Sequence, residues 1–276
     1  MGGRSPRLLA PGLLGCVLLV AAPRRLQCQE DAPSDALRRV LAMEPMELLR
    51  ACLAKTQTLD AFTQVATKRE RIKGRLNPVE TMFLKCRAEP LSIYMKWITK
   101  PYKGREVIYV KGKNGGKSIV HHYAGPFNIH LKVDPFGARV QKRSRRPVTR
   151  AGVRNSTKAL LDLCETALKR GHMQLTVQGT EELDGRTVVV LQRLLEKHPD
   201  YGVHKALIYI DPKQMLPVKC VGYDWDDRLQ WVYETKTLCT DVQLTDKDFD
   251  PKNPKYRYPD GVVDLHLRMP WPFRGK

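Results

Sequence analysis

Residues 91–97 read Leu-Ser-Ile-Tyr-Met-Lys-Trp, so a large apolar side chain stands at every second position. Successive side chains of a β-strand point to opposite faces of a sheet, so this spacing gathers the apolar ones on one face. That face consists of Leu91, Ile93, Met95 and Trp97. Alternation of this kind is typical of a half-buried antiparallel strand, which has one face on a core and the other in water.

The same period of two recurs along most of the chain. It predicts strands at 61–75, 79–88, 91–97, 104–112, 116–123, 127–133, 173–178, 186–194, 203–211, 216–224 and 228–239. Asn114-Gly115 and Asp184-Gly185 each separate two neighbouring strands, and both are typical of two-residue hairpin turns.

Two stretches have the 3.6-residue period of amphipathic helices. The first begins near Ser34, restarts at Pro45 and continues its apolar stripe to Leu53, and the second covers 157–170. A long antiparallel sheet with so few helices must curl. We therefore expect a mainly β (α+β) fold with a single curled antiparallel sheet of about 11 strands. Two amphipathic helices would cover its mouth and leave an apolar cavity, and a fully packed core without a cavity is the alternative.

The first residues have the parts of a secretory signal. Basic residues precede an apolar run from Leu8 to Ala22, which is too short and too interrupted to span a bilayer. We expect a cleaved signal peptide at 1–28, a domain at 29–258, a poorly packed tail at 259–276, and export to the periplasm or cell envelope. An uncleaved anchor and lipidation at Cys16, where Leu-Leu-Gly-Cys resembles a lipoprotein signal, are the alternatives.

Positive charge dominates the composition. The chain carries 48 Lys and Arg against 29 Asp and Glu, a formal net charge of +19. Such an excess indicates an anionic partner. Because the protein is expected to be exported, we expect no nucleic acid partner, which leaves an anionic envelope surface or an acidic partner protein.

Two basic features are specific enough to name as candidates for docking to an anionic surface. In the first predicted strand, four cations share one face: Arg69, Arg71, Lys73 and Arg75. The second is the run from Arg139 to Arg150, whose central cations are Arg143, Arg145 and Arg146. Both are expected on an outer face, and a purely solubilising role is an equal alternative.

No motif predicts catalysis, a metal site or a cofactor. Gly112 to Ser118 resembles a phosphate-binding loop, but Lys111 stands where that motif needs its first glycine. The histidines have no ligand spacing. The cysteines after residue 28 are odd in number and irregularly spaced, so we expect mostly buried thiols instead of a disulfide framework. The protein is therefore expected not to be an enzyme and to bind no cofactor.

Several strand segments resemble a known protein family. They are Glu80 to Lys85, Pro90 to Trp97, Gly104 to Val110, Leu207 to Asp211, Leu216 to Val218 and Leu244 to Phe249. These segments are similar to an uncharacterised family of exported bacterial proteins, domain of unknown function 1571, over about residues 45–258.

A strand that ends in Asp211, followed by Leu216-Pro217 and a new strand, also resembles a broader LolA-like superfamily. That superfamily includes the carrier and the receptor of the lipoprotein-sorting (Lol) pathway and a periplasmic regulator of an anti-sigma factor. The resemblance implies an incomplete antiparallel barrel that is closed by helices and binds acyl chains in its apolar concavity. It supplies no catalytic residue.

The sequence thus predicts an exported, non-enzymatic protein that binds a lipid or the acyl chains of a lipoprotein, as a carrier or sorting factor does. The predicted ligand contacts lie on apolar strand faces: Met82, Leu84, Ile93, Met95, Trp97, Phe127, Ile129, Leu131, Leu229, Trp231 and Tyr233. Arg105 is the candidate contact to a headgroup, with a lock on the helical lid or a surface role as alternatives. One rival function is an envelope interaction or sensor module that binds a protein or polysaccharide through its basic faces, without a lipid cavity. The other is an envelope hydrolase whose site assembles only in three dimensions.

Overall fold

The computed structural model describes Gly2 and residues 34–124, 127–256 and 258, and it describes their side chains except within 122–129. The predicted signal peptide at 1–28, with Cys16, and the predicted tail at 259–276 lie outside the described residues.

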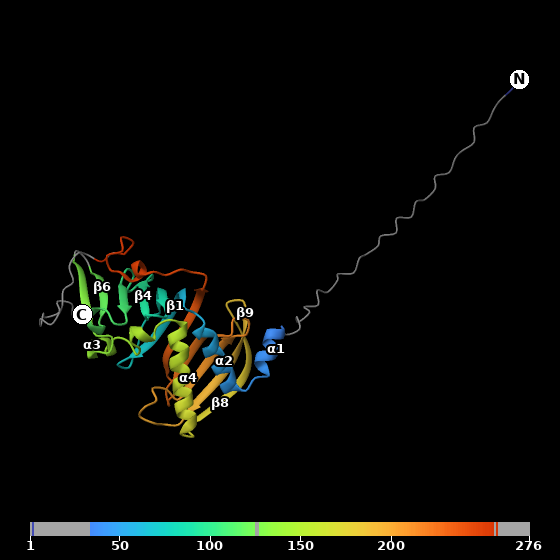
Figure 1. Ribbon diagram of the computed structural model, residues 1–276. Coiled ribbons are helices and arrows are strands. Elements are labelled where there is room, and N and C mark those ends of the chain that lie inside the picture. Colours follow the sequence, from blue (N-terminus) through green and yellow to red (C-terminus); the bar gives the residue numbers. More distant parts are fainter. Residues whose placement is uncertain (1, 3–33, 125–126, 257, 259–276) are drawn as a thin grey trace. The chain divides into compact units, whose positions relative to one another are not determined.

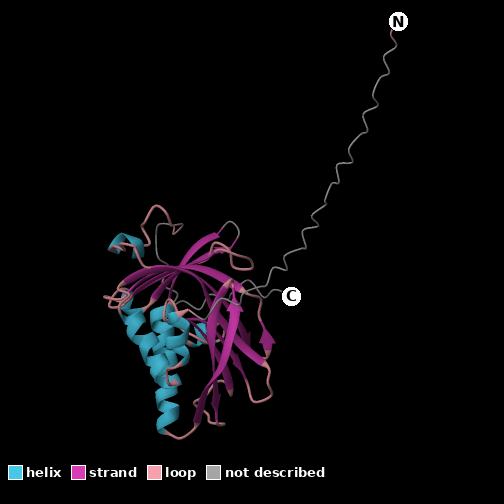
Figure 2. Cartoon of the chain, turned by 90° about the vertical axis from the view of Figure 1, so that its right-hand side faces the viewer, coloured by secondary structure: helices cyan, strands magenta, loops and turns pink. Residues whose placement is uncertain are grey.

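One antiparallel sheet dominates the domain (Figure 1). Its strands are β1 (Ala61–Ile72), β2 (Arg75–Leu76), β3 (Glu80–Arg87), β4 (Ser92–Trp97), β5 (Glu106–Val110), β6 (Ser118–Ala124), β7 (Phe127–Val133), β8 (Met173–Leu183), β9 (Arg186–Leu195), β10 (Lys205–Asp211), β11 (Leu216–Tyr223) and β12 (Leu229–Cys239). They are hydrogen-bonded in the order β7-β6-β5-β4-β3-β1-β12-β11-β10-β9-β8, and β2 pairs with β1. The sheet is curved, with the helices on its inner side (Figure 2). The predicted fold class, a single curled and open antiparallel sheet, is confirmed.

The first strand is shorter than its sequence pattern predicts. β1 ends at Ile72, because Lys73 (φ 51°) and Gly74 (φ 79°) adopt left-handed backbone conformations that turn the chain back. Arg75 then lies on β2 and pairs with Ile72. The prediction of one strand through 61–75 is therefore wrong at its end, and the four cations do not form one stripe.

Three helices pack on the concave side of β8–β11 (Figures 1 and 2). α1 (Asp35–Leu41) and α2 (Pro45–Gln57) are the two parts of the first predicted helix, and α4 (Val153–Lys169) is the second. Their apolar stripes form a core cluster with the sheet: Leu37, Val40, Leu48, Leu49, Cys52, Leu161, Cys164, Val189, Leu191, Ile208 and Ile210. None of the helices in the described ranges has the length and apolar character that a bilayer crossing requires.

Helix α4 begins earlier than predicted because of a glycine. Gly152 precedes the helix with φ +86°, and a Cβ at this position would lie 2.8 Å from Cys86 Sγ and 3.1 Å from Phe62 Cζ. Only glycine allows both the left-handed backbone and this close approach to the sheet. The chain is thereby brought onto β1 and β3 before the helix starts at Val153.

Residues 244–256 and 258, here called the C-terminal segment, cover the convex side of β4 and β5. Tyr256 stacks on Tyr94 with ring centroids 4.1 Å apart, and Asp248 pairs with Lys85 at 2.7 Å. Tyr94 is consequently only 2% exposed. The prediction that this strand is half-buried is therefore wrong, because both of its faces are covered.

Every cysteine in the described part of the chain is a free thiol. Cys52, Cys86 and Cys164 are buried, whereas Cys239 is exposed. Burial disfavours the thiolate and raises the pKa of Cys52 to about 12 and that of the half-buried Cys220 to about 11. The prediction of buried thiols is confirmed for Cys52, Cys86 and Cys164.

Candidate ligand-binding cavity

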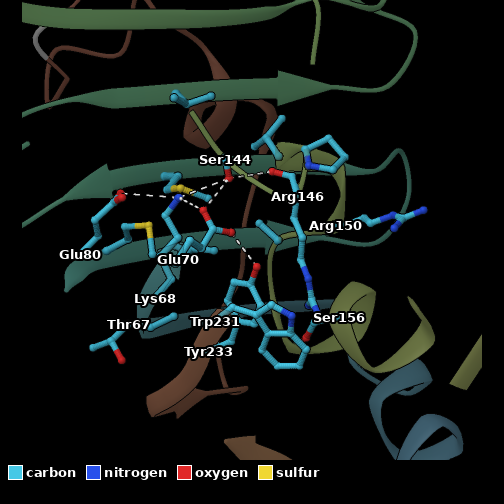
Figure 3. A pocket seen from close by; sticks show the side chains of 18 of the residues that line it. Thr67, Lys68, Glu70, Glu80, Ser144, Arg146, Arg150, Ser156, Trp231 and Tyr233 are labelled. Carbon is cyan, nitrogen blue, oxygen red and sulfur yellow. Dashed lines mark hydrogen bonds and ion pairs between the residues drawn. The ribbon is translucent and has the colours of Figure 1, made fainter. Parts of the chain in front are cut away.

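The concave side of the sheet encloses a cavity of about 1340 Å³. Its walls come from β1, β3–β7, β11 and β12, from the first turns of α4, and from residues 134–152 (Figure 3). This last stretch links β7 to α4, contains α3 (Ala138–Gln141) and is here called the strap. Pockets for drug-sized ligands measure roughly 300–1,000 Å³, so this cavity is large. Of the two alternatives for the concave side, a cavity and a packed core, the structure has the cavity.

Apolar strand side chains form the floor of the cavity. Seven of the predicted ligand contacts contribute to its lining: Met82, Leu84, Met95, Trp97, Leu131, Trp231 and Tyr233. Trp231 lies against Gly222 of the neighbouring strand, where a Cβ would come within 2.4 Å of the indole. This part of the wall therefore depends on a glycine in β11.

Two other predicted contacts are described and do not line the cavity. Ile93 is fully buried in the same apolar cluster as the floor. Leu229 packs into a cluster on the opposite face of the sheet, so its prediction as a ligand contact is wrong. The cause is a bulge: Gly222 pairs with Trp231 but Tyr223 pairs with Leu229, which breaks the alternation between these two positions of β12.

The remaining two predicted apolar contacts, Phe127 and Ile129, are on β7, but their side chains lie outside the described residues. Their contribution to the lining stays a prediction.

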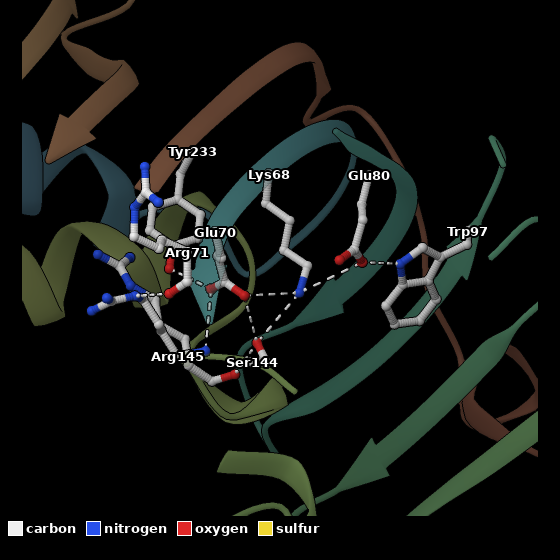
Figure 4. A network of polar contacts seen from close by, with 9 residues as sticks. Lys68, Glu70, Arg71, Glu80, Trp97, Ser144, Arg145 and Tyr233 are labelled. Atoms are coloured by element: carbon white, nitrogen blue, oxygen red, sulfur yellow. Dashed lines mark hydrogen bonds and ion pairs between the residues drawn. The ribbon is translucent and has the colours of Figure 1, made fainter. Parts of the chain in front are cut away.

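The buried carboxylate of Glu70 anchors the strap to β1 (Figure 4). Its side chain is 2% exposed. Oε1 accepts hydrogen bonds from the Tyr233 hydroxyl at 2.6 Å and from the backbone N–H of Arg145 at 3.3 Å. Oε2 accepts from the Ser144 hydroxyl and from the Lys68 ammonium, each at 3.3 Å. Hydrogen bonds to an ionised group are stronger than neutral ones, so this carboxylate holds two strap residues against the sheet.

Lys68 extends this network to the wall formed by β3 and β4 (Figure 4). Its Nζ lies 3.6 Å from Oε2 of Glu80, which also accepts a hydrogen bond from the indole N–H of Trp97 at 2.6 Å. The network therefore fixes the orientation of an aromatic side chain in the cavity wall.

Two arginines lie over aromatic rings of the cavity lining. The Arg146 guanidinium is 4.1 Å from the ring centroid of Tyr233 and 5.3 Å from that of Trp231, and the Arg105 guanidinium is 4.1 Å from that of Tyr102. Stacking of this kind occupies the flat face of a guanidinium and leaves its N–H edge for other partners. Neither guanidinium has a hydrogen bond or ion pair to another residue in the described part of the chain. Burial disfavours the charged form and lowers the pKa of Arg105.

Some of the predicted docking cations line the cavity, and the others contact the main chain around β1. Four contribute to the cavity lining: Lys73, Arg75, Arg143 and Arg146. The turn after Ile72 and the strap's anchor on Glu70 bring these segments to the cavity, whereas Lys73, Arg75 and Arg143 also remain exposed, so their docking to an anionic surface stays a prediction.

The other three cations bond to the main chain around β1. Nε of Arg69 donates to the Asn77 carbonyl, and Nε of Arg71 donates to the Leu229 carbonyl. Arg145 lines a small pocket between α3 and the β1–β2 turn and donates to the carbonyl of Arg71. Docking of any of these cations to an anionic surface stays a prediction.

The sequence interpretation missed the polar network of the cavity. Lys68 and Glu70 are separated by even numbers of residues from Phe62, a buried residue at the start of the same strand. Counting the alternation from Phe62 would have placed both on the concave side. For Ser144, which lies outside any strand, the local pattern contains no such signal.

Several solved structures are similar to this chain at low sequence identity. The Mycobacterium tuberculosis lipoprotein LppX is 16% identical over 72% of this chain and 97% of its own, with a TM-score of 0.44. MucB is 13% identical over 75% of this chain and 62% of its own, with a TM-score of 0.48. A LolA superfamily protein from Nitrosomonas europaea is 10% identical over 76% of this chain and 98% of its own, with a TM-score of 0.32. The chain thus spans less than two thirds of the length of MucB.

No curated protein sequence matches the chain significantly. The model of the family described as Protein of unknown function (DUF1571) matches residues 59–258. This range contains all the described strands, the strap and α4, and therefore the whole cavity. The family inferred from the strand segments is confirmed, and the chain belongs to the DUF1571 family.

Proposed function

We propose that the protein is an exported, non-enzymatic lipid-binding protein that holds acyl chains in the cavity of its open barrel. The observation that carries this proposal is the cavity of about 1340 Å³ with apolar strand side chains on its floor. Burial of apolar surface contributes about 25 cal/mol for each Å² removed from water, so an extended methylene chain is well suited to such a floor. With a lipid or a lipoprotein acyl chain as its ligand, the protein would act as a carrier or sorting factor.

The strap completes the enclosure on the side away from the floor. Val140, Pro147 and Val148 contribute apolar surface to the lining from this segment. The strap belongs to no strand of the sheet and is held by the hydrogen bonds to Glu70. A segment with these attachments can open without breaking the sheet, which a binding site enclosed in this way requires.

A hydrolytic function has less support. The hydroxyl of Ser144 lies 3.3 Å from Nζ of Lys68, which is the spacing of a nucleophile and a base. Lys68, however, is ion-paired with both Glu70 and Glu80. An ammonium group held in this way has no lone pair with which to take the proton of a serine hydroxyl.

An interaction module without a lipid ligand also has less support. That alternative relied on seven basic residues, and four of them contribute to the lining of the cavity. A large enclosed space has no role in a module that binds only through its outer surface.

The test uses the full chain, purified from a host that contains membranes and examined by native mass spectrometry. We expect bound lipid, and we expect the protein to take up a diacylglycerol that carries a fluorescent label. Ala66→Trp places an indole in the cavity and should abolish uptake, whereas Thr180→Trp on the exposed side of β8 should leave it unchanged. Val120→Trp obstructs the cavity from β6 and provides a second variant if the first is unstable.

Thermal unfolding identifies the variants that remain folded. A wild-type protein that carries no lipid and takes up no diacylglycerol would overturn the proposal. Full uptake by a folded variant with an obstructed cavity would overturn it as well.

A further inference from the structure

The cavity carries an excess of positive charge. Ten lysines and arginines contribute to its lining, against three glutamates. Two of these glutamates, Glu70 and Glu80, already pair with Lys68. Neutral acyl chains would bring no negative charge to this lining.

Arg146 and Arg105 are the members of this set whose geometry best fits ligand recognition. Each guanidinium is stacked on an aromatic ring of the lining, at 4.1 Å from the ring centroid. Within the described ranges, neither has a carboxylate partner, although the cavity removes them in part from water. A desolvated cation is unfavourable unless an opposite charge or hydrogen-bond acceptors compensate it.

Stacking also orients the two side chains in advance. A guanidinium whose face lies on a ring directs its N–H groups outward in a planar fork, which matches the oxygens of a phosphate or a carboxylate. The backbone of Arg145, the residue before Arg146, is held by Glu70, so the polar network also positions this fork.

We propose that the ligand of this cavity is an anionic amphiphile, whose phosphate or carboxylate headgroup binds Arg146 and Arg105 while its chains lie on the apolar floor. This inference rests on the proposed function and defines its ligand class. Because Arg146 belongs to the strap, binding of the headgroup also stabilises the strap in its closed position.

The test compares two fluorescent probes with identical acyl chains, labelled phosphatidic acid and labelled diacylglycerol, in titrations of the full-length protein. We expect the anionic probe to bind about 10- to 100-fold more tightly, which is the effect of one or two charge-assisted hydrogen bonds. Arg146→Gln and Arg105→Gln should each reduce this ratio, because they weaken binding of phosphatidic acid more than binding of diacylglycerol. Arg146→Lys keeps the charge without the planar fork and should give an intermediate ratio.

Arg39→Gln removes an exposed cation on α1 and is the matched control, for which the ratio should not change. A loss of stability alone would weaken both probes equally, so the ratio separates recognition from folding. Equal affinities of the wild type for both probes, or a ratio that neither glutamine variant alters, would overturn the inference and leave the proposed function intact. Tight binding of inorganic phosphate alone, at the affinity of phosphatidic acid, would also overturn it, because the site would then recognise a free anion. Failure of both probes to bind would refute the proposed function itself.

Discussion

Glu70→Gln is the substitution that most directly tests the anchor of the strap. The amide oxygen of glutamine can still accept the hydrogen bonds from the Tyr233 hydroxyl and the Arg145 N–H. The amide nitrogen, however, would face the Lys68 ammonium, which can only donate, whereas the Ser144 hydroxyl can turn and accept a hydrogen bond from it. The variant therefore loses the charge and the hydrogen bond from Lys68, while its shape is conserved.

The magnitude follows from these contacts. Removing one partner of a buried ion pair costs about 3–5 kcal/mol, and a hydrogen bond to a charged group contributes about 1.5–3 kcal/mol. Lys68 keeps Glu80 as a second carboxylate at 3.6 Å and its side chain is 14% exposed, so the cost should lie between these two ranges. We expect Glu70→Gln to lower the free energy of unfolding by about 2–4 kcal/mol.

Equilibrium urea unfolding measures this loss, and hydrogen exchange of peptides from residues 138–150 measures the release of the strap. The midpoint should fall without a change in the m-value, and the strap peptides should exchange faster than those of β9. Glu181→Gln, at an exposed position on β8, is the matched control and should change the free energy of unfolding by less than about 0.5 kcal/mol. If Glu70→Gln matches this control in both measurements, the carboxylate does not anchor the strap.

Three further predictions concern the helix start, the thiols and the C-terminal segment. Gly152→Ala should destabilise the protein by about 2–4 kcal/mol in urea unfolding, because it adds backbone strain and a clash with β1 and β3. Gly171→Ala has φ +72° but open space around it, so it should cost only about 1–2 kcal/mol. Equal losses in the two variants would refute the clash. At pH 8, peptide mapping after brief treatment with iodoacetamide should find Cys239 alkylated and Cys52 intact, since burial raises the pKa of Cys52 to about 12; comparable labelling of both would contradict this. Partial burial opposes ionisation of Asp248, but the hydrogen bonds from Lys85 and Thr245, together with the charge of Lys85, outweigh it and lower the pKa of Asp248. Because this pKa is lower in the folded than in the unfolded protein, the ionised carboxylate stabilises the fold at a pH above its unfolded pKa, and this stabilisation is lost as the pH falls through its folded pKa. Hydrogen exchange of residues 244–256 should therefore accelerate below about pH 4. Unchanged protection at pH 3 would exclude this attachment.

Local patterns in the sequence predicted the sheet well, because the alternation of apolar and polar side chains is visible within each strand. The alternation of Leu91, Ile93, Met95 and Trp97 requires only neighbours along one strand, and it correctly assigned their shared face. The start of the first helix could be predicted for the same reason, since the Ser34 side chain accepts a hydrogen bond from an N–H only three residues away.

The failures occurred where a distant segment determines the outcome. Tyr94 was expected to face water, but the C-terminal segment, more than 150 residues later, covers it. Leu229 was assigned to the concave side, but a bulge between β11 and β12 reverses its direction. A bulge depends on the pairing of two strands, so the alternation within β12 alone does not reveal it.

The candidate site shows the same division. The apolar floor of the cavity was predicted from strand faces, and seven of the residues named there line it. The polar network was not predicted, because Ser144 binds Glu70 from 74 residues away in the sequence and no local pattern indicates this contact.

Sequence alone determined that this chain forms one curled antiparallel sheet with an apolar concave face, because side-chain alternation is a property of each strand. It also determined that the protein is strongly basic. Only the tertiary structure decided where that charge lies: a turn at Lys73-Gly74 and a buried carboxylate at Glu70 bring basic segments to the lining of the cavity. The physical reason is that a buried charge selects its position through several partners at once, and those partners come together only when the chain has folded.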